Sequence, residues 1–148
     1  MQNFTTTLHK DLVEKHLIYL PAGNAKFTLV DVRDIGAFAA QVIGNPQNHV
    51  NRAYELTCNE KLTFSEMAVQ MTSVLGIPIK YNSPNLLSFY LTKRKEKVPA
   101  GLIMVMIMLH YLPRFQKEPL ISDWIKVITG REPINFRKFL EVNQNSLR

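Results

Sequence analysis

The chain has 148 residues, 46% of them hydrophobic and 20% charged, which is typical of one globular domain with a hydrophobic core. Its net charge of +6 permits attraction to anions but does not choose among nucleotides, nucleic acid and lipid headgroups. The single cysteine, Cys58, excludes an internal disulfide framework and a multi-cysteine metal site, and is typical of a reducing compartment.

The first predicted elements are a short helix and a strand. Apolar residues recur at helical spacing over residues 8–13, after three threonines that offer an N-cap. Residues 17–20 form an apolar run typical of a strand. The segment 21–24 has turn chemistry, because its Gly and Asn tolerate positive φ.

The central unit is a strand over residues 27–30 that runs directly into a helix over 32–43. Asp31 stands at the N-cap, and Asp34 lies in the first turn, where a carboxylate favours the positive end of the helix dipole. Gly44 then ends the helix. The residues predicted to form its buried apolar face are Val32, Ile35, Ala39, Val42 and Ile43. Such a strand–helix unit predicts an α/β fold, in which ligands bind near strand ends.

A second strand and helix follow. Residues 53–57 alternate and predict a strand. Thr63 and Glu66 have the spacing of a capping box, which predicts a helix that ends at Gly76. The residues expected on its buried face are Phe64, Met67, Ala68, Met71 and Leu75. Residues 77–81 are a further short strand candidate.

Four helices are predicted in the rest of the chain: 84–97, 100–112, 120–129 with Ser122 as cap, and one that begins near Asn135. The inward residues expected on three of them are Leu87, Tyr90, Leu91, Trp124, Ile128, Phe136, Phe139 and Leu140. The basic residues over 93–97 are expected at a solvated helix end. The methionine-rich helix 100–112 is apolar on all sides, which leaves open whether it is core or a surface for a partner or ligand.

Targeting and membrane segments are not predicted. Polar residues fill the N-terminal positions where a signal peptide has its apolar region. The longest apolar run, residues 102–109, is far shorter than the roughly 20 residues that span a bilayer. We therefore expect a cytoplasmic protein with no membrane and no nucleic-acid partner.

Recognisable catalytic chemistry is absent from the sequence. No two glycines have the G-x-G or G-x-x-G spacing that cradles dinucleotide phosphates, and no Tyr is followed by Lys four residues later. The four histidines share no metal-ligand spacing, so surface or packing roles are expected for them. Cys58 is expected to be a small, partly buried thiol, and Asp31 and Asp34 to serve the helix start rather than a carboxylate pair. We assign no catalytic residue and no metal site.

Several stretches, in this order along the chain, resemble the C-terminal half of NmrA-like proteins. These proteins are atypical short-chain dehydrogenases, including quinone oxidoreductases and proteins labelled nucleoside-diphosphate-sugar epimerases. The matching stretches are Met1-Gln-Asn-Phe4, Leu20-Pro-Ala-Gly23, Leu29-Val-Asp-Val-Arg-Asp-Ile35, Ala53-Tyr-Glu-Leu-Thr57, Thr63-Phe-Ser-Glu66 and Thr129-Gly-Arg-Glu-Pro133. Cys58 departs from the family pattern, because many relatives have Gly there.

The resemblance implies the C-terminal part of a Rossmann-like NAD(P)-binding protein. Residues 1–60 would be the trailing strands and helix of the sheet, and 61–148 a mainly helical substrate-side lobe. Met1, Gln2, Asn3 and Phe4 match the stretch that approaches the nicotinamide end of NADP or NAD. The glycine-rich loop of the family would belong to a first half outside this sequence. We therefore expect the chain alone to bind no cofactor.

Three functions are consistent with the sequence. The intact relative would be an NAD(P)-dependent oxidoreductase acting on a quinone or small carbonyl compound, with this chain inactive alone. Alternatively, the protein is a non-enzymatic regulator that senses the redox state of the nucleotide. The third reading is a truncated chain or assembly module, which would associate as a homo-oligomer or with a missing N-terminal half.

Overall fold

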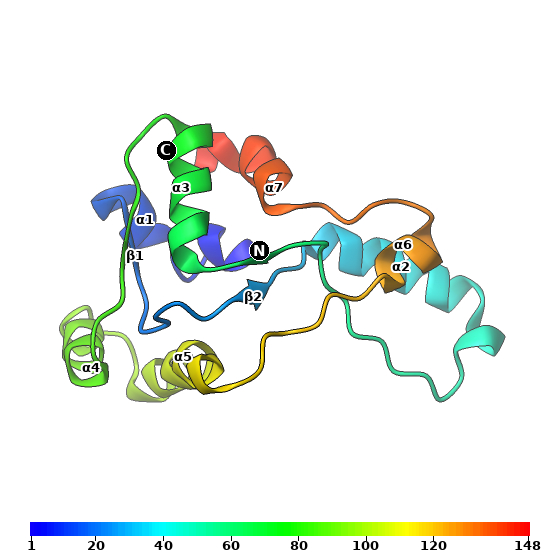
Figure 1. Ribbon diagram of the computed structural model, residues 1–148, viewed down its shortest axis with the longest axis horizontal. Helices are drawn as coiled ribbons and strands as arrows, with labels where there is room; N and C mark the ends of the chain where they lie inside the picture. The colour runs from blue at the N-terminus through cyan, green and yellow to red at the C-terminus, as the bar shows by residue number, and fades with distance from the viewer.

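A computed structural model describes residues 1–148 and shows a helix-rich α/β chain with four very short strands (Figure 1). The α-helices are α1 (His9–Lys15), α2 (Val32–Gly44), α3 (Phe64–Leu75), α4 (Leu86–Lys95), α5 (Ala100–Tyr111), α6 (Trp124–Thr129) and α7 (Phe136–Asn143). The 3-10 turns are η1 (Gln2–Thr5), η2 (Pro46–His49), η3 (Leu112–Phe115) and η4 (Gln144–Ser146). The strands are β1 (Leu17–Tyr19), β2 (Phe27–Thr28), β3 (Lys61–Leu62) and β4 (Lys80–Asn82). No helix is both long and apolar enough to span a bilayer.

The strands form two separate pairs. β1 and β4 are parallel, with Ile18 opposite Tyr81, whereas β2 and β3 are antiparallel, with Phe27 opposite Leu62. Three of them, β1, β2 and β4, confirm the predicted strands near 17–20, 27–30 and 77–81, although each is shorter or shifted, whereas β3 was not predicted. Each pair has only two strands, so hydrophobic packing by the helices must provide most of the stability.

The predicted strand at 53–57 is wrong. These residues join no sheet, and two of their polar groups instead contact the segment before α6. The Ser122 hydroxyl donates to the Glu55 carbonyl, and the Ser122 backbone N–H donates to Thr57 Oγ1 at 2.9 Å. Ser122 therefore anchors this segment and does not cap α6, which begins at Trp124.

One hydrophobic core joins α1, α3, α4, α5 and α7, which gather on one side of the molecule in Figure 1. The predicted buried face of α3 is confirmed, and so are the three inward residues of α7. Side chains that are completely or almost completely buried include Leu12, Ile18, Met67, Met71, Phe89, Ile103, Phe136, Phe139 and Leu140. The division at residue 60 into a sheet part and a helical lobe stays a prediction.

The capping box at the start of α3 is confirmed. Glu66 N donates to Thr63 Oγ1 at 3.2 Å, and Thr63 N donates to Glu66 Oε2 at 2.8 Å. This reciprocal pair satisfies backbone donors that have no partner within the helix. At the other end, Gly76 adopts φ +72°, a left-handed conformation that favours glycine.

Replacing Thr63 with alanine is expected to lower the free energy of unfolding by about 1 kcal/mol, because the Glu66 N–H loses its cap. Urea denaturation followed by circular dichroism measures this difference. Thr63→Ser keeps the hydroxyl and is the matched control. An unchanged unfolding midpoint in the alanine variant would contradict the role assigned to this cap.

Helix α4 is rotated relative to the prediction. Leu87 and Leu91 were expected inside but are 68% and 50% exposed, whereas Phe89 is fully buried. The basic end of the helix is not wholly solvated either. Lys93 is buried and forms ion pairs with Asp11 of α1 and, at 2.8 Å, with Glu96. The pairing satisfies a charge that would be costly to bury alone.

Helix α2 has the predicted bounds, but its predicted apolar face is wrong. Val32 and Ile43 are 53% and 76% exposed, while Phe38 is buried on the opposite side. The Tyr54 ring lies between Phe38 and Trp124, with centroid distances of 5.2 and 4.9 Å. Figure 1 shows α6 lying beside α2 on the side of the molecule away from the main core.

The α6 expectations need correction. Trp124 lies at the start of the helix and remains 38% exposed, and the buried position is Ile125 rather than Ile128. The predicted stop at Gly130 is confirmed, with φ +71°. The predicted threonine cap of the first helix is also wrong, because α1 begins after Leu8 with no side-chain cap.

Helix α5 is apolar on all sides, as predicted, and only two of its residues are buried, Ile103 and Met106. Leu102 and Leu109 are among its exposed residues, and four others continue with Leu112 of η3 as one stripe at the spacing i, i+3, i+4, i+7 and i+11. The stripe comprises Gly101, Met104, Val105, Met108 and Leu112. We call this set the α5 stripe.

Candidate functional site

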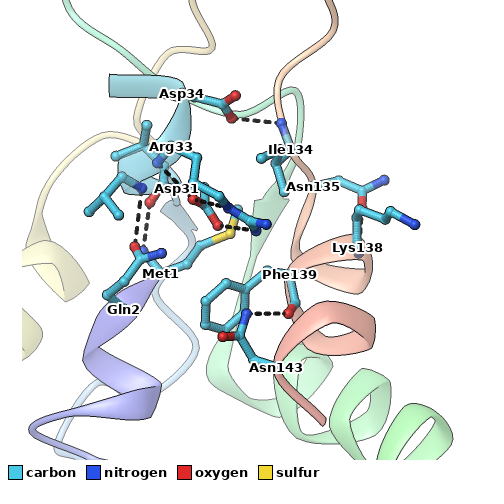
Figure 2. Close-up of polar contacts among 12 residues, drawn as sticks. Met1, Gln2, Asp31, Arg33, Asp34, Ile134, Asn135, Lys138, Phe139 and Asn143 are labelled. Atoms are coloured by element: carbon cyan, nitrogen blue, oxygen red, sulfur yellow. Dashed lines mark hydrogen bonds and ion pairs between the residues drawn. The ribbon is translucent and has the colours of Figure 1, made fainter. Parts of the chain in front are cut away.

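The four residues predicted to bind the cofactor lie against the junction of β2 and α2. The backbone nitrogen of Met1 donates to the Val30 carbonyl at 2.6 Å. The Gln2 side-chain Oε1 accepts from Val32 N at 3.2 Å, so it satisfies a donor at the first turn of α2 (Figure 2). These contacts hold η1 beside the strand–helix unit around which the sequence is organised.

Asp31 caps α2, as predicted. Its carboxylate is fully buried and accepts from Arg33 N at 2.9 Å and from the Arg33 guanidinium at 2.9 and 2.8 Å (Figure 2). The hydrogen bonds from Arg33 lower the pKa of the Asp31 carboxyl. The carboxylate is therefore ionised near neutral pH and is committed to holding the helix start.

Asp34 has a different partner that the sequence did not indicate. Its carboxylate is fully buried and accepts from Ile134 N at 2.7 Å (Figure 2). It also accepts from Arg131 Nη2 at 3.2 Å. Arg131 and Ile134 lie in the segment between α6 and α7. Asp34 thus ties α2 to the C-terminal part of the chain, and Asp31 and Asp34 do not form a carboxylate pair.

A small cavity of about 200 Å³ lies between η1, β2 and α5. Met1, Asn3 and Phe4 line it together with Phe27, Phe64 and His110. Gln2 does not line the cavity, because its side chain contacts α2. The structure therefore brings three of the four predicted residues together around one space, which we call the η1–α5 cavity.

Phe4 contributes to the core as well as to the cavity wall. It is only 2% exposed, and its ring lies 5.1 Å from Phe136 and 6.4 Å from Phe64, measured between centroids. Asn3 is exposed, and its side chain has no hydrogen-bond partner in the protein. Of the predicted residues, Asn3 is the one whose polar side chain is free to contact a ligand.

His110 is a site residue that the sequence analysis missed, since it was expected only to pack or face solvent. Its ring lies 6.2 Å from Phe27 and 5.7 Å from Phe64, measured between centroids. Burial lowers the pKa of the imidazole, so the ring is neutral near pH 7. No sequence signal distinguished His110, because its environment is made by residues more than 40 positions away.

The lining of the η1–α5 cavity is apolar and aromatic with few polar side chains. Aromatic walls and the free Asn3 amide suit a flat ring with a polar substituent. The glycine-rich turn that binds pyrophosphate is not found within these 148 residues. Cys58 bonds through its backbone N–H to the Leu29 carbonyl at 2.7 Å and is fully buried, whereas a partly buried thiol was predicted, and burial raises the pKa of this thiol.

Comparison with known proteins gives the chain two curated relatives. It is 28% identical over 130 residues to an NAD(P)H azoreductase from Xenophilus azovorans, covering 88% of this chain and 45% of the relative. It is 26% identical over 148 residues to an agroclavine dehydrogenase from Claviceps fusiformis, covering 51% of that protein. The chain thus spans about half the length of the curated relatives it matches. No family model matches the sequence.

Solved structures share the fold. A triphenylmethane reductase from Citrobacter sp. superposes with a TM-score of 0.84 at 17% identity, over 98% of this chain and 50% of that one. An NADPH-dependent quinone oxidoreductase from Escherichia coli gives 0.77 at 16% identity, over 95% and 50%. A nucleoside-diphosphate-sugar epimerase from Staphylococcus aureus gives 0.78 at 20% identity, over 93% and 48%. These matches confirm the predicted α/β fold and the resemblance to half of an NmrA-like, Rossmann-type protein.

Proposed function

We propose that this chain forms the substrate-side half of an NAD(P)-dependent oxidoreductase that reduces a quinone or a similar small carbonyl compound. The observation that carries the proposal is the η1–α5 cavity, in which Met1 and Asn3 lie beside an aromatic wall and a neutral histidine. Support comes from the relatives, which include an NAD(P)H azoreductase and an NADPH-dependent quinone oxidoreductase.

In this proposal the residues of the chain bind and orient, and the nicotinamide supplies the hydride when it is bound. Met1 and the Asn3 amide would contact the nicotinamide end, with η1 held in place by the Gln2 bond to α2. Phe27 and Phe64 would exclude water from the reacting ring, which would strengthen polar interactions inside the site. Because these 148 residues contain no glycine-rich turn for the cofactor phosphates, we expect the chain alone to be inactive.

A chimaera tests the proposal. The part of the Xenophilus azovorans azoreductase that lies outside the matched region would be fused before Met1, and NADPH oxidation would be followed with a soluble benzoquinone. We expect quinone-dependent NADPH oxidation by the chimaera and none by the chain alone. Asn3→Ala should reduce kcat/KM about tenfold, the effect of losing one orienting hydrogen bond. A folded chimaera that binds NADPH but reduces no quinone would refute the proposed reaction.

A second candidate function is an assembly or regulatory role without catalysis, and the α5 stripe is the observation that favours it. Met104, Val105 and Met108 are 57%, 45% and 51% exposed on one side of a helix that carries no charged residue. Contiguous apolar surface of this kind often marks an interaction site. A homo-oligomer formed through α5 is therefore part of this alternative.

Val105→Glu or Met108→Glu is expected to shift an oligomer toward the monomer, because a carboxylate buried at an interface without a partner is destabilising. Light scattering coupled to size exclusion measures the molar mass. Lys95→Glu, which also changes an exposed residue, is the control and should leave the mass unchanged. A wild-type chain that stays monomeric at high concentration would rule out this assembly.

A further inference from the structure

We infer that the η1–α5 cavity binds a single planar aromatic ring that carries an N–H or O–H donor, and that His110 Nε2 accepts the hydrogen bond from that donor. The inference rests on the proposed function in one respect. The ring is that of the hydroquinone formed in the proposed reduction or the carboxamide-bearing ring of nicotinamide, and both carry an O–H or N–H donor.

The size and walls of the cavity select a single ring. A volume of about 200 Å³ exceeds the roughly 150 Å³ of cavities known to hold benzene and leaves space for one small substituent. The ring centroids of Phe27 and Phe64 are 5.0 Å apart, and the angle between the ring planes is 55°. Tilted rings at this spacing offer both faces and edges, which are the surfaces that aromatic ligands prefer.

The hydrogen bond to α5 fixes the tautomer of His110. Its Nδ1 lies 2.7 Å from the Met106 carbonyl oxygen. Because a carbonyl only accepts, Nδ1 carries the proton, and in the neutral ring Nε2 is left with a lone pair. The second nitrogen of His110 is therefore an acceptor, not a donor.

Nε2 is open to a ligand. Nε2 has no hydrogen-bond partner in the protein. Gln70 Oε1 is the only side-chain nitrogen or oxygen that is both fully buried and without a partner, so Nε2 is not fully buried. His110 Nε2 is consequently accessible, and His110 lines the cavity. A donor on the ligand would satisfy this acceptor, which becomes costly to leave unpaired once an apolar ring displaces water from the site.

The cavity also selects against charge. No Asp, Glu, Lys or Arg side chain lines it, and apart from His110 its polar side chains are those of Asn3 and Thr28. A charged ligand would lose hydration without gaining an ionic side chain as a partner. The chemical class is therefore a neutral phenol, hydroquinone, aromatic amine or aromatic carboxamide.

A titration of the full chain with small probes tests the inference without added cofactor or activity. Two-dimensional ¹H–¹⁵N spectra would be recorded with phenol, with aniline, with nicotinamide, and with toluene, which has the shape of phenol but no donor. We expect shifts around Thr28, Leu109 and His110, and dissociation constants at least about fivefold lower for phenol and aniline than for toluene. Comparing the dissociation constants of nicotinamide and phenol then shows whether the cavity prefers the ring of the cofactor or a phenolic ring.

Two variants of His110 and one control variant distinguish a loss of ligand recognition from a loss of folding. His110→Phe keeps a flat ring beside Phe27 and Phe64 but removes the acceptor, so the preference for phenol over toluene should disappear. His110→Gln offers an amide oxygen and should retain part of it. His49→Phe, the same replacement in a different cavity, should leave the preference intact, and thermal melts verify folding.

Equal binding of phenol and toluene by the wild-type chain, or no binding of either, would overturn the inference. So would a preference for phenol that survives in a folded His110→Phe variant. Each of these outcomes would refute only the ligand proposed for the η1–α5 cavity. The proposed oxidoreductase function is judged separately by NADPH oxidation in the chimaera, so the two can fail independently.

Discussion

Replacing Phe4 with alanine is expected to lower the free energy of unfolding by about 3–5 kcal/mol, the usual cost of truncating a buried phenylalanine. The ring is 2% exposed and packs against Phe136 and Phe64, so its loss leaves a cavity between η1, α3 and α7. Urea denaturation at constant temperature gives the difference from the shift of the midpoint.

The neighbouring residue provides the contrast. Asn3 is exposed, and Asn3→Ala should change the stability of the chain by less than about 0.5 kcal/mol while affecting the ligand site. Phe4→Leu fills part of the space and should cost less than the alanine change. A Phe4→Ala variant as stable as the wild type would mean that η1 does not pack on the core.

Replacing Asp34 with alanine is expected to cost about 3 kcal/mol. The change removes the acceptor of the Ile134 N–H and the partner of Arg131 at a fully buried position. Hydrogen bonds to a buried charge are worth more than neutral ones, and an orphaned buried donor adds its own desolvation penalty. Chemical denaturation again measures the loss.

Asp34→Asn is the matched control, since the amide oxygen still accepts from Ile134 N while the charge is removed. It should cost less than the alanine variant. Hydrogen exchange adds a local readout, because the Ile134 amide should lose protection in Asp34→Ala and keep most of it in Asp34→Asn. Unchanged protection of Ile134 in the alanine variant would contradict the link between α2 and the C-terminal segment.

The elements that the sequence predicted well are specified by local chemistry. The Thr63 and Glu66 capping box, the apolar spacing after it and the glycine at position 76 all lie within α3 or beside it. Asn135 at the start of α7 is a comparable local signal, since its side chain accepts from Lys138 N at 2.8 Å (Figure 2). Such contacts reach three residues along the chain, so they can be predicted without the fold.

The expectations that failed depend on distant partners. The spacing of Val32 and Ile43 indicated an apolar face, but periodicity does not say which face the rest of the chain covers. The buried face of α2 is set by Tyr54, and Asp34 bonds to residues almost 100 positions away. Residues 53–57 had strand-like alternation, yet the Glu55 carbonyl and the Thr57 hydroxyl bond to Ser122 and not to a neighbouring strand.

The candidate site shows the same division. The resemblance pointed to Met1, Gln2, Asn3 and Phe4, and their role in binding NAD(P) stays a prediction. In the structure the Gln2 side chain bonds to the first residue of α2, and Phe4 is buried in the core. The sequence did not predict these different roles. His110 was missed because its importance depends on the packing of α5 beside Phe27 and Phe64.

The most direct test of the central claim is an isothermal calorimetric titration of the 148-residue chain with NADPH. The claim is that these residues form the substrate side of an NAD(P)-dependent site whose phosphate-binding half lies outside them. We expect heats too small to fit a micromolar dissociation constant, because no helix of the chain is preceded by a glycine-rich turn that could hold the pyrophosphate. Micromolar affinity for NADPH would contradict the claim.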